Sequence, residues 1–258
     1  MKDYIIGSIS GNYTINNLKT WIETSNSFEN VERVLFLYND TNPELKQFCI
    51  DNNVNLIIPD FDFYGNELKD FIADSGKLTT DNAHKMIHHI RFLHYSFFLN
   101  DLNEDDRIIL TDINDVKFQN NPFEHKIFKS HKGIIATSEE ITFEKENWNF
   151  DCLKATFGVL SFGDIKSKTI NCAGVIGGSA GVLSKLCADI YLLCLNKSRN
   201  ADQVAFNYLI NGSYKPLTTF SNIEDNFTVH LHVIAHKLVQ FDLTRLNDYS
   251  IIHQYDRL

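Results

Sequence analysis

Short hydrophobic runs alternate with polar, helix-favouring stretches along the beginning of the chain. Runs rich in β-branched and aromatic residues predict strands at residues 4–10, 31–38 and 55–59. Between them, residues 18–24 and 44–52 are typical of short helices. Strands that alternate with helices at this spacing predict βαβ units, and therefore a largely parallel sheet with right-handed connections.

The alternation continues to the end of the chain. Residues 80–99 predict a long helix, with Ile90 and Phe97 on the face that packs against the sheet. Residues 60–79 and 141–168 lack a clear period, and we expect a flexible loop with a short helix in the first and a mixed insert in the second. The other predicted elements are strands at residues 107–112, 133–140, 170–181, 228–236 and 250–253, and helices at residues 182–196 and 200–210.

The strand that begins at Arg107 ends in a group of oxygen-bearing side chains. Aliphatic residues precede Asp112, and Asn114 and Asp115 follow it closely. A buried strand of this kind places Asp112 at the carboxyl edge of a parallel sheet, where open α/β sheets bind ligands. Carboxylates fixed there can hold a divalent cation. The competing interpretation is an ordinary turn, because Asp and Asn are common turn residues.

The composition is compatible with this architecture and disfavours nucleic acid as the main partner. A chain of 258 residues, 43% hydrophobic and 22% charged, can form one large α/β domain with a substantial core. Its 33 acidic residues outnumber 24 basic ones, and the net charge of −9 disfavours nucleic acid as a partner. An anionic small molecule remains compatible with this charge if a metal ion and a few local cations supply the positive field.

The cysteines and the first residues favour a cytoplasmic protein. The five cysteines are odd in number and form no CxxC pair, which indicates free thiols in a reducing compartment. The chain begins with a strand and lacks the apolar core of a signal peptide. Residues 175–195 contain Lys185 and Asp189 and are a poor membrane span. We therefore expect no membrane span.

Three other patterns are weak signals for a site when taken singly. His84 and His88 are spaced to share a helix face, but no HExxH motif is present, so packed or surface histidines are favoured over a zinc site. The glycines of residues 174–181 match neither dinucleotide-binding nor P-loop spacing, and close approach of the backbone to a sugar or acceptor fits them better. Asp202 lies in the first turn of a predicted helix, where the helix dipole alone favours a carboxylate.

Taken in order, the motifs resemble those of the GT-A fold glycosyltransferases, which use a nucleotide-sugar donor and a divalent metal. The resemblance covers most of the chain. It implies one Rossmann-like α/β domain with a mixed, mainly parallel sheet flanked by helices, in which residues 1–125 bind the nucleotide and residues 126–258 bind the acceptor. The matching segments are the first strand and loop at residues 6–13, a DxD-like motif at 112–115, Asn-x-x-Gly-Val at 171–175, Asp202-Gln203, and the terminal His-Gln-Tyr-Asp-Arg at 253–257.

The resemblance also implies roles for individual residues. Asp112, Asp115 and His253 would bind Mn²⁺ or Mg²⁺, which bridges the diphosphate of a UDP- or GDP-sugar. Asp202 would face the reaction centre, as the general base of an inverting enzyme or, with Gln203, as a stabilising group in a retaining one. The residues expected to contact the donor are Ser8, Ser10, Tyr13, Arg91, Asp112, Asn114, Asn171, Gly174 and Arg257.

Some points stay open at this level. Asn114 occupies the third position of the DxD-like motif, so either Asn114 or Asp115 supplies the second metal ligand. Glu139 is a second candidate base, and the acceptor is expected to be a hydroxyl of a glycan or glycoprotein. A nucleotidyltransferase is an alternative, although residues 8–14 contain no cation for a phosphate loop. A non-catalytic carbohydrate- or protein-binding module is another.

Overall fold

A computed structural model describes residues 1–10, 13–38, 42–59, 83–131, 133–158, 165–195, 197 and 200–257. For Ser10 and residues 83–86 it describes the backbone alone. The predicted loop at residues 60–79, and Gly11 and Asn12 of the loop predicted after the first strand, lie outside the described residues.

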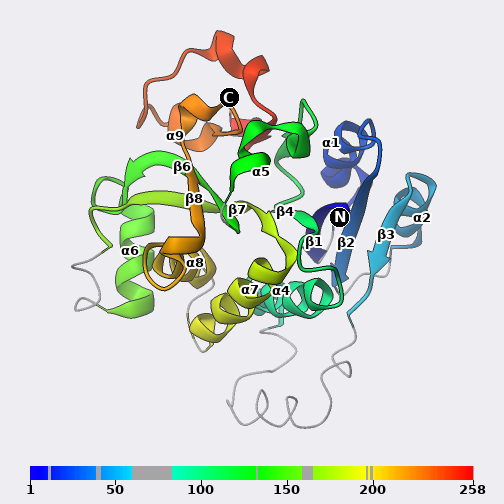
Figure 1. Ribbon diagram of the computed structural model, residues 1–258, viewed down its shortest axis with the longest axis horizontal. Helices are drawn as coiled ribbons and strands as arrows, with labels where there is room; N and C mark the ends of the chain where they lie inside the picture. Colours follow the sequence, from blue (N-terminus) through cyan, green and yellow to red (C-terminus); the bar gives the residue numbers. More distant parts are fainter. Residues whose placement is uncertain are drawn as a thin grey trace.

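Within the described residues, seven strands form a central sheet in the order β3-β2-β1-β4-β7-β6-β8 (Figure 1). Neighbouring strands are parallel except at β7, which runs antiparallel to β4 and to β6. The sheet is therefore mixed and mainly parallel, as predicted. Its strands are β1 (Asp3–Ser10), β2 (Val31–Tyr38), β3 (Val54–Ile57), β4 (Arg107–Thr111), β6 (Ile134–Thr142), β7 (Thr169–Ser179) and β8 (Thr218–Ser221).

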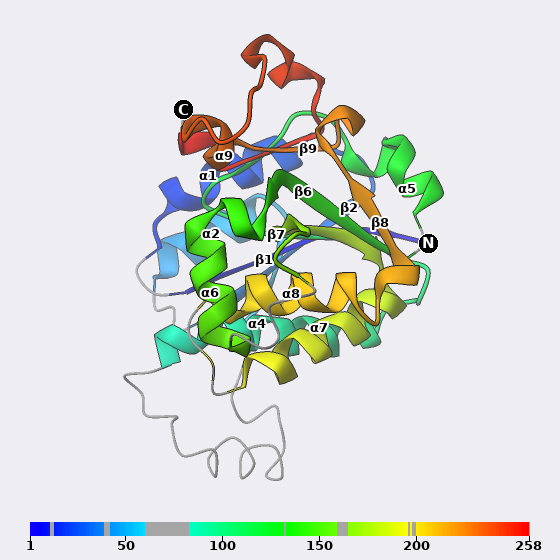
Figure 2. The ribbon, with the colours of Figure 1, turned by 90° about the vertical axis from the view of Figure 1, so that its left-hand side faces the viewer.

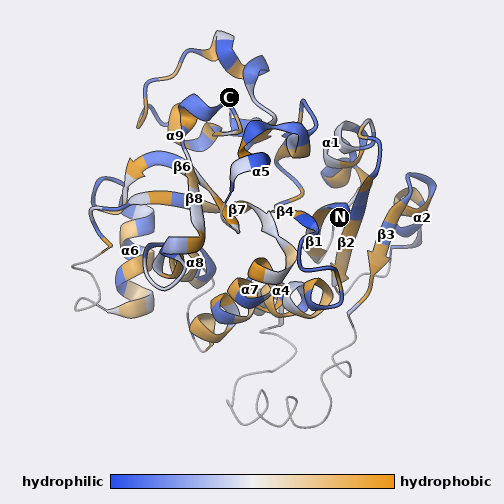
Figure 3. Ribbon diagram, viewed as in Figure 1, coloured by the Kyte–Doolittle hydropathy of each residue, from blue (hydrophilic) through white to orange (hydrophobic). Residues whose placement is uncertain are grey.

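Helices cover both faces of the sheet because successive side chains along a strand point to opposite faces. Ile6 and Phe36 pack in one cluster with α4 (Ala83–Asn100), α7 (Ala180–Cys194) and α8 (Ala201–Asn211). Their neighbours Ile5 and Leu35 pack with α1 (Ile15–Ser25), α2 (Pro43–Asp51) and α5 (Lys126–Ser130). Figure 2 shows α4, α7 and α8 together below the sheet, and Figure 3 shows hydrophobic colouring along its strands. The result is a single three-layer α/β domain.

Local sequence signals explain where α2 begins and how α1 is attached to the sheet. Asn42 accepts hydrogen bonds from the backbone of Glu44 and Leu45, and Pro43 occupies the first turn of α2, where its missing N–H is not needed. Trp21 of α1 is fully buried, and its indole N–H donates to the hydroxyl of Thr111 at 2.8 Å. This bond ties α1 to the end of β4, directly before Asp112.

Beyond the carboxyl end of β4, a small second sheet forms in the described chain. It has the order β5-β10-β9, with strands β5 (Val116–Phe118), β9 (Thr228–His230) and β10 (Ile251–His253). His253 lies opposite Val116 in β5 and opposite His230 in β9. This pairing brings the end of the chain beside Asp115.

Some predicted elements were wrong in part. The strand predicted at residues 228–236 ends at His230, and α9 (Leu231–Ala235) follows. The mixed insert contains a regular helix, α6 (Asn147–Phe157), which begins where the Glu146 side chain accepts two backbone N–H bonds. On the face of α4 predicted to pack against the sheet, Ile90 is buried as expected, but Phe97 is 38% exposed. No helix in the described chain is long and apolar enough to cross a membrane.

Candidate functional site

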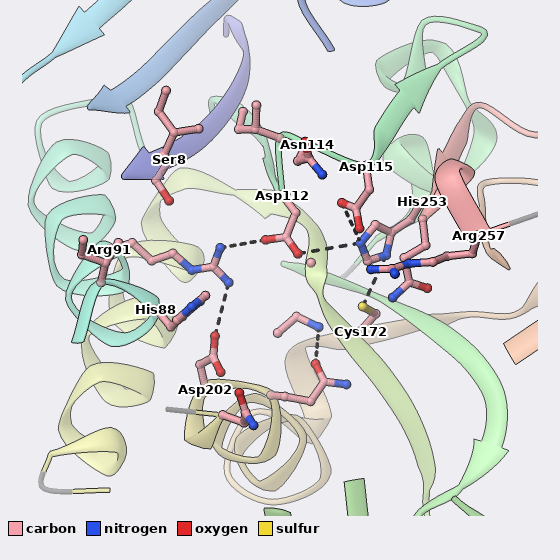
Figure 4. A pocket seen from close by; sticks show the side chains of 18 of the residues that line it. Ser8, His88, Arg91, Asp112, Asn114, Asp115, Cys172, Asp202, His253 and Arg257 are labelled. Carbon is pink, nitrogen blue, oxygen red and sulfur yellow. Dashed lines mark hydrogen bonds and ion pairs between the residues drawn. The ribbon is translucent and has the colours of Figure 1, made fainter. Parts of the chain in front are cut away.

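A cavity of about 440 Å³ lies at the carboxyl end of β1 and β4. Its wall is completed by α4, the first turn of α8, the middle of β7 and the end of the chain (Figure 4). The residues predicted for the site that line this cavity are Ser8, Tyr13, Arg91, Asp112, Asn114, Asp115, Gly174, Asp202, Gln203, His253 and Arg257, and Glu139 lies there too.

Arg91 joins two sides of the cavity. Its guanidinium donates to Asp112 Oδ1 at 2.8 Å and to Asp202 Oδ2 at 3.3 Å. Burial alone would lower the pKa of Arg91, but the two carboxylates outweigh burial and raise it above its ordinary value. Arg91 therefore remains a fixed positive charge that connects β4 with α8.

Asp112, Asp115 and His253 form a compact group of possible metal ligands. Each offers one atom within 4.8 Å of the others. His253 Nε2 lies 3.7 Å from Asp112 Oδ2 and 3.6 Å from Asp115 Oδ1, too far for good hydrogen bonds. Atoms that share one small divalent ion, at bonds of about 2.0–2.2 Å, are typically about 3–4 Å apart.

The charge balance at this group favours a cation. His253 Nε2 is buried and has no hydrogen-bond partner among the described residues. Burial would lower the pKa of His253, but Asp112 and Asp115 outweigh burial and raise it. Burial raises the pKa of Asp115, whereas Arg91 and His253 hold the pKa of Asp112 well below its ordinary value despite burial. The space between His253 Nε2 and the two carboxylates therefore favours positive charge. A proton can supply this charge, and so can a divalent metal ion, which the three side chains fit.

Because Gly174 has no side chain, Asp112 and His253 can pack directly against its backbone. A Cβ atom at this position would lie 2.6 Å from His253 Cε1 and 2.7 Å from Asp112 Oδ2. The Gly174 carbonyl also accepts a 2.8 Å hydrogen bond from the Asp112 backbone. The glycine is therefore required by close packing against both possible ligands.

Asn114 and Asp115 point in different directions. Asp115 faces His253, whereas Asn114 is exposed and its side-chain oxygen accepts a 2.7 Å hydrogen bond from Asn17. The carbonyl of Asn114 also accepts a bond from the Tyr255 hydroxyl at 3.3 Å. This placement favours Asp115 as the second metal ligand.

Asn171 is not brought to this cavity. Its backbone N–H donates to the Asn207 side chain at 2.8 Å, and its own amide donates to the Thr169 carbonyl. Asn171 is buried and lines a different hollow together with Glu140, where its amide is held by these bonds. The side chain of Ser10 lies outside the described residues.

Gln203 and Glu139 form a buried polar link behind the metal-ligand group. Gln203 Oε1 accepts a 2.7 Å bond from the Ala173 backbone, and Gln203 Nε2 donates to Glu139 at 3.4 Å. Burial raises the pKa of Glu139 to about 7, against the opposing effects of Cys172, His253 and Gln203. Glu139 can therefore exchange a proton near neutral pH.

Several cavity residues were not among those predicted for the site. Cys172 is a buried free thiol, and its sulfur lies 3.5 Å from His253 Nδ1. Gln254 and His88 also line the cavity. His230, which contacts His253 from the neighbouring strand, was predicted only as part of an amphipathic strand. These positions depend on pairing between segments distant in sequence, which no local pattern reveals.

The chain matches no protein-family model and none of the curated proteins. Similar folds occur among solved structures. The galactosyltransferase LgtC, in complex with donor and acceptor sugar analogs, aligns with 97% of this chain and 86% of its own at 12% identity and a TM-score of 0.57.

Two structures of the glycosyltransferase GlyE of Streptococcus pneumoniae TIGR4 also align. The apo form gives a TM-score of 0.54 at 14% identity, and the other structure gives 0.51 at 15% identity. Each covers 98% of this chain, which spans 54% of GlyE. The chain has the GT-A-type fold of these glycosyltransferases.

Proposed function

We propose that this protein is a metal-dependent glycosyltransferase that transfers a sugar from a UDP- or GDP-sugar to a hydroxyl group of a glycan or glycoprotein. The observation that carries the proposal is the convergence of Asp112, Asp115 and His253 on one point of the cavity. This cation site lies at the sheet edge where open α/β folds bind ligands. The GT-A-type fold supports the same conclusion.

The donor would lie across the cavity, with its diphosphate at the cation site. Mn²⁺ or Mg²⁺ held by the three side chains would neutralise the diphosphate and stabilise the leaving group. Ser8 and Tyr13 line the part of the cavity formed by the first strand and loop, where a nucleoside would bind. Arg257, whose side chain is half exposed at the rim, would add positive charge beside the phosphates.

The sugar would then lie between the cation site and α8. Asp202 reaches this space from the first turn of the helix and is held there by Arg91. In an inverting reaction, Asp202 would accept the proton of the acceptor hydroxyl; in a retaining reaction, Asp202 or Gln203 would stabilise the positively charged sugar. Glu139 is the second candidate base.

Trp148 would form part of the acceptor site. It belongs to α6, lines the cavity and is 52% exposed, which is unusual for so large an apolar side chain. An exposed indole ring at a polar cavity offers a flat surface for the apolar face of a sugar, together with an N–H donor. This favours a glycan as the acceptor.

The proposal is tested by thermal shift with a panel of UDP- and GDP-sugars, in Mn²⁺ and in EDTA. At least one donor is expected to stabilise the protein only when Mn²⁺ is present. Asp112→Asn should abolish this effect, whereas Asp105→Asn, at an exposed acidic residue before β4, should preserve it. Metal-independent binding, or no binding of any nucleotide-sugar, would refute the proposal.

A further inference from the structure

A chain of buried hydrogen bonds extends behind His253, away from the cavity. His253 Nδ1 lies 2.9 Å from His230 Nδ1, and His230 Nε2 lies 3.1 Å from the hydroxyl of Thr137. That hydroxyl donates to the Val175 carbonyl at 3.0 Å. His253, His230 and Thr137 are each at most 2% exposed.

The direction of each bond follows from the far end of this chain. The Val175 carbonyl can only accept, so Thr137 uses its single proton there and must accept a proton from His230 Nε2. A neutral His230 that carries its proton on Nε2 has a lone pair on Nδ1. The described hydrogen bonds of His230 join it to no carboxylate, and such a buried site favours the neutral imidazole.

The bond between the two histidines then determines where His253 carries its proton. Because His230 Nδ1 accepts, His253 Nδ1 must donate, and the lone pair of His253 lies on Nε2. Nε2 is the atom that faces Asp112 and Asp115. In the opposite tautomer, His253 Nε2 would carry the hydrogen and could not bind a metal.

We propose that His230 is a positioning residue that holds His253 in the tautomer whose Nε2 can ligate a divalent cation. The proposal rests on the metal site of the proposed function and adds the residue that prepares it. Partners that orient a metal-binding histidine in this way usually contribute about 10- to 100-fold to metal affinity.

Cys172 is the competing partner for the same atom. Its sulfur lies 3.5 Å from His253 Nδ1, and sulfur is a weak acceptor. If Cys172 oriented His253, Cys172→Ala would reduce metal affinity and His230 variants would not. We expect the reverse, because the 2.9 Å contact with His230 is a much better hydrogen bond.

Two amide substitutions test the roles of the two ring nitrogens of His230 separately. In His230→Asn, the side-chain oxygen can occupy the place of Nδ1 and still accept from His253. In His230→Gln, the amide reaches the place of Nε2 and contacts Thr137 instead. Mn²⁺ affinity, measured by calorimetry or electron paramagnetic resonance, should remain within about threefold of wild type in the Asn variant and fall about 10- to 100-fold in the Gln variant. Equal affinities in the two variants would overturn the proposal.

The tautomer can also be read directly in the wild-type protein without metal. Long-range ¹H–¹⁵N nuclear magnetic resonance at alkaline pH, where both imidazoles are neutral, should show the His253 proton on Nδ1 and the His230 proton on Nε2. A His253 proton on Nε2 would overturn the proposal even if the variants fail to fold. The predicted tautomers in a protein that binds no Mn²⁺ would support the hydrogen-bond chain and refute the metal site of the proposed function.

Discussion

Gly174→Ala tests whether the cavity depends on close packing at the cation site. The added Cβ would lie 2.6 Å from His253 Cε1, 2.7 Å from Asp112 Oδ2 and 2.9 Å from His253 Nε2, whereas ordinary contacts begin near 3.4 Å. Relief of the shortest contact requires a movement of about 0.8 Å. That contact is with His253, which is buried and bonded to His230, and the next shortest is with the more exposed Asp112, so both ligands are expected to be displaced.

The expected consequence is a loss of metal binding with a modest loss of stability. Coordination tolerates deviations of only about 0.2 Å, so a shift of this size should weaken Mn²⁺ binding by at least about 100-fold. Overpacking of this kind typically costs about 1–3 kcal/mol in the free energy of unfolding. Gly174 does not have a positive φ, so alanine adds no backbone strain.

The assay is Mn²⁺ calorimetry combined with urea denaturation in EDTA. Gly181→Ala is the matched control, because its Cβ would be similarly crowded, 2.8 Å from Glu104 Cβ, but outside the cavity. The control should retain wild-type Mn²⁺ affinity. A Gly174→Ala protein that binds Mn²⁺ as tightly as wild type would refute the steric argument and the assigned ligand positions.

Three further predictions concern residues around the reaction centre. Asp202→Asn should lower the rate of sugar transfer about 10²- to 10⁴-fold while Mn²⁺ affinity, measured by calorimetry, stays unchanged; undiminished transfer would exclude Asp202 as the base. Trp148→Ala should raise the acceptor KM about 3- to 10-fold, as expected for one lost stacking contact, and leave donor hydrolysis intact; an unchanged KM would contradict the acceptor site. Burial raises the pKa of Glu139 from 4.5 to about 7, so the folded protein keeps a proton that the unfolded chain loses. The contribution of Glu139 to the free energy of unfolding is therefore highest below about pH 4.5 and falls as the pH rises through 7. Urea denaturation in EDTA should therefore show Glu139→Gln gaining up to about 3 kcal/mol relative to wild type between pH 4.5 and 8, and a pH-independent difference would contradict the assigned burial.

Local patterns in the sequence were sufficient for most of the sheet and its helices. Alternation between strand and helix predicted β1, β2 and β4 close to their observed bounds, because each is a buried strand with a nearly continuous apolar run. Asp112 could be assigned to a strand end for the same reason. The short α9 was missed because Thr228–His230 is a strand and the apolar alternation continues past it without a break.

The site required information that is not local. His253 meets Asp115 because β10 pairs with β5, and it meets His230 because β10 pairs with β9. Only the resemblance of the terminal motif suggested the first pairing, and nothing in the sequence indicated the second. Asn171 shows the converse limit, since its motif suggested the donor site but its side chain lies in a different hollow, bonded to the Thr169 carbonyl.

The central claim is that the carboxylates and His253 hold a metal that serves sugar transfer from a nucleotide-sugar. It is tested most directly by identifying the products formed from the stabilising donor in Mn²⁺, without an acceptor. Slow release of free sugar and nucleoside diphosphate that stops in EDTA and in Asp112→Asn is the predicted result. Release of pyrophosphate, or equal turnover by Asp112→Asn, would contradict it.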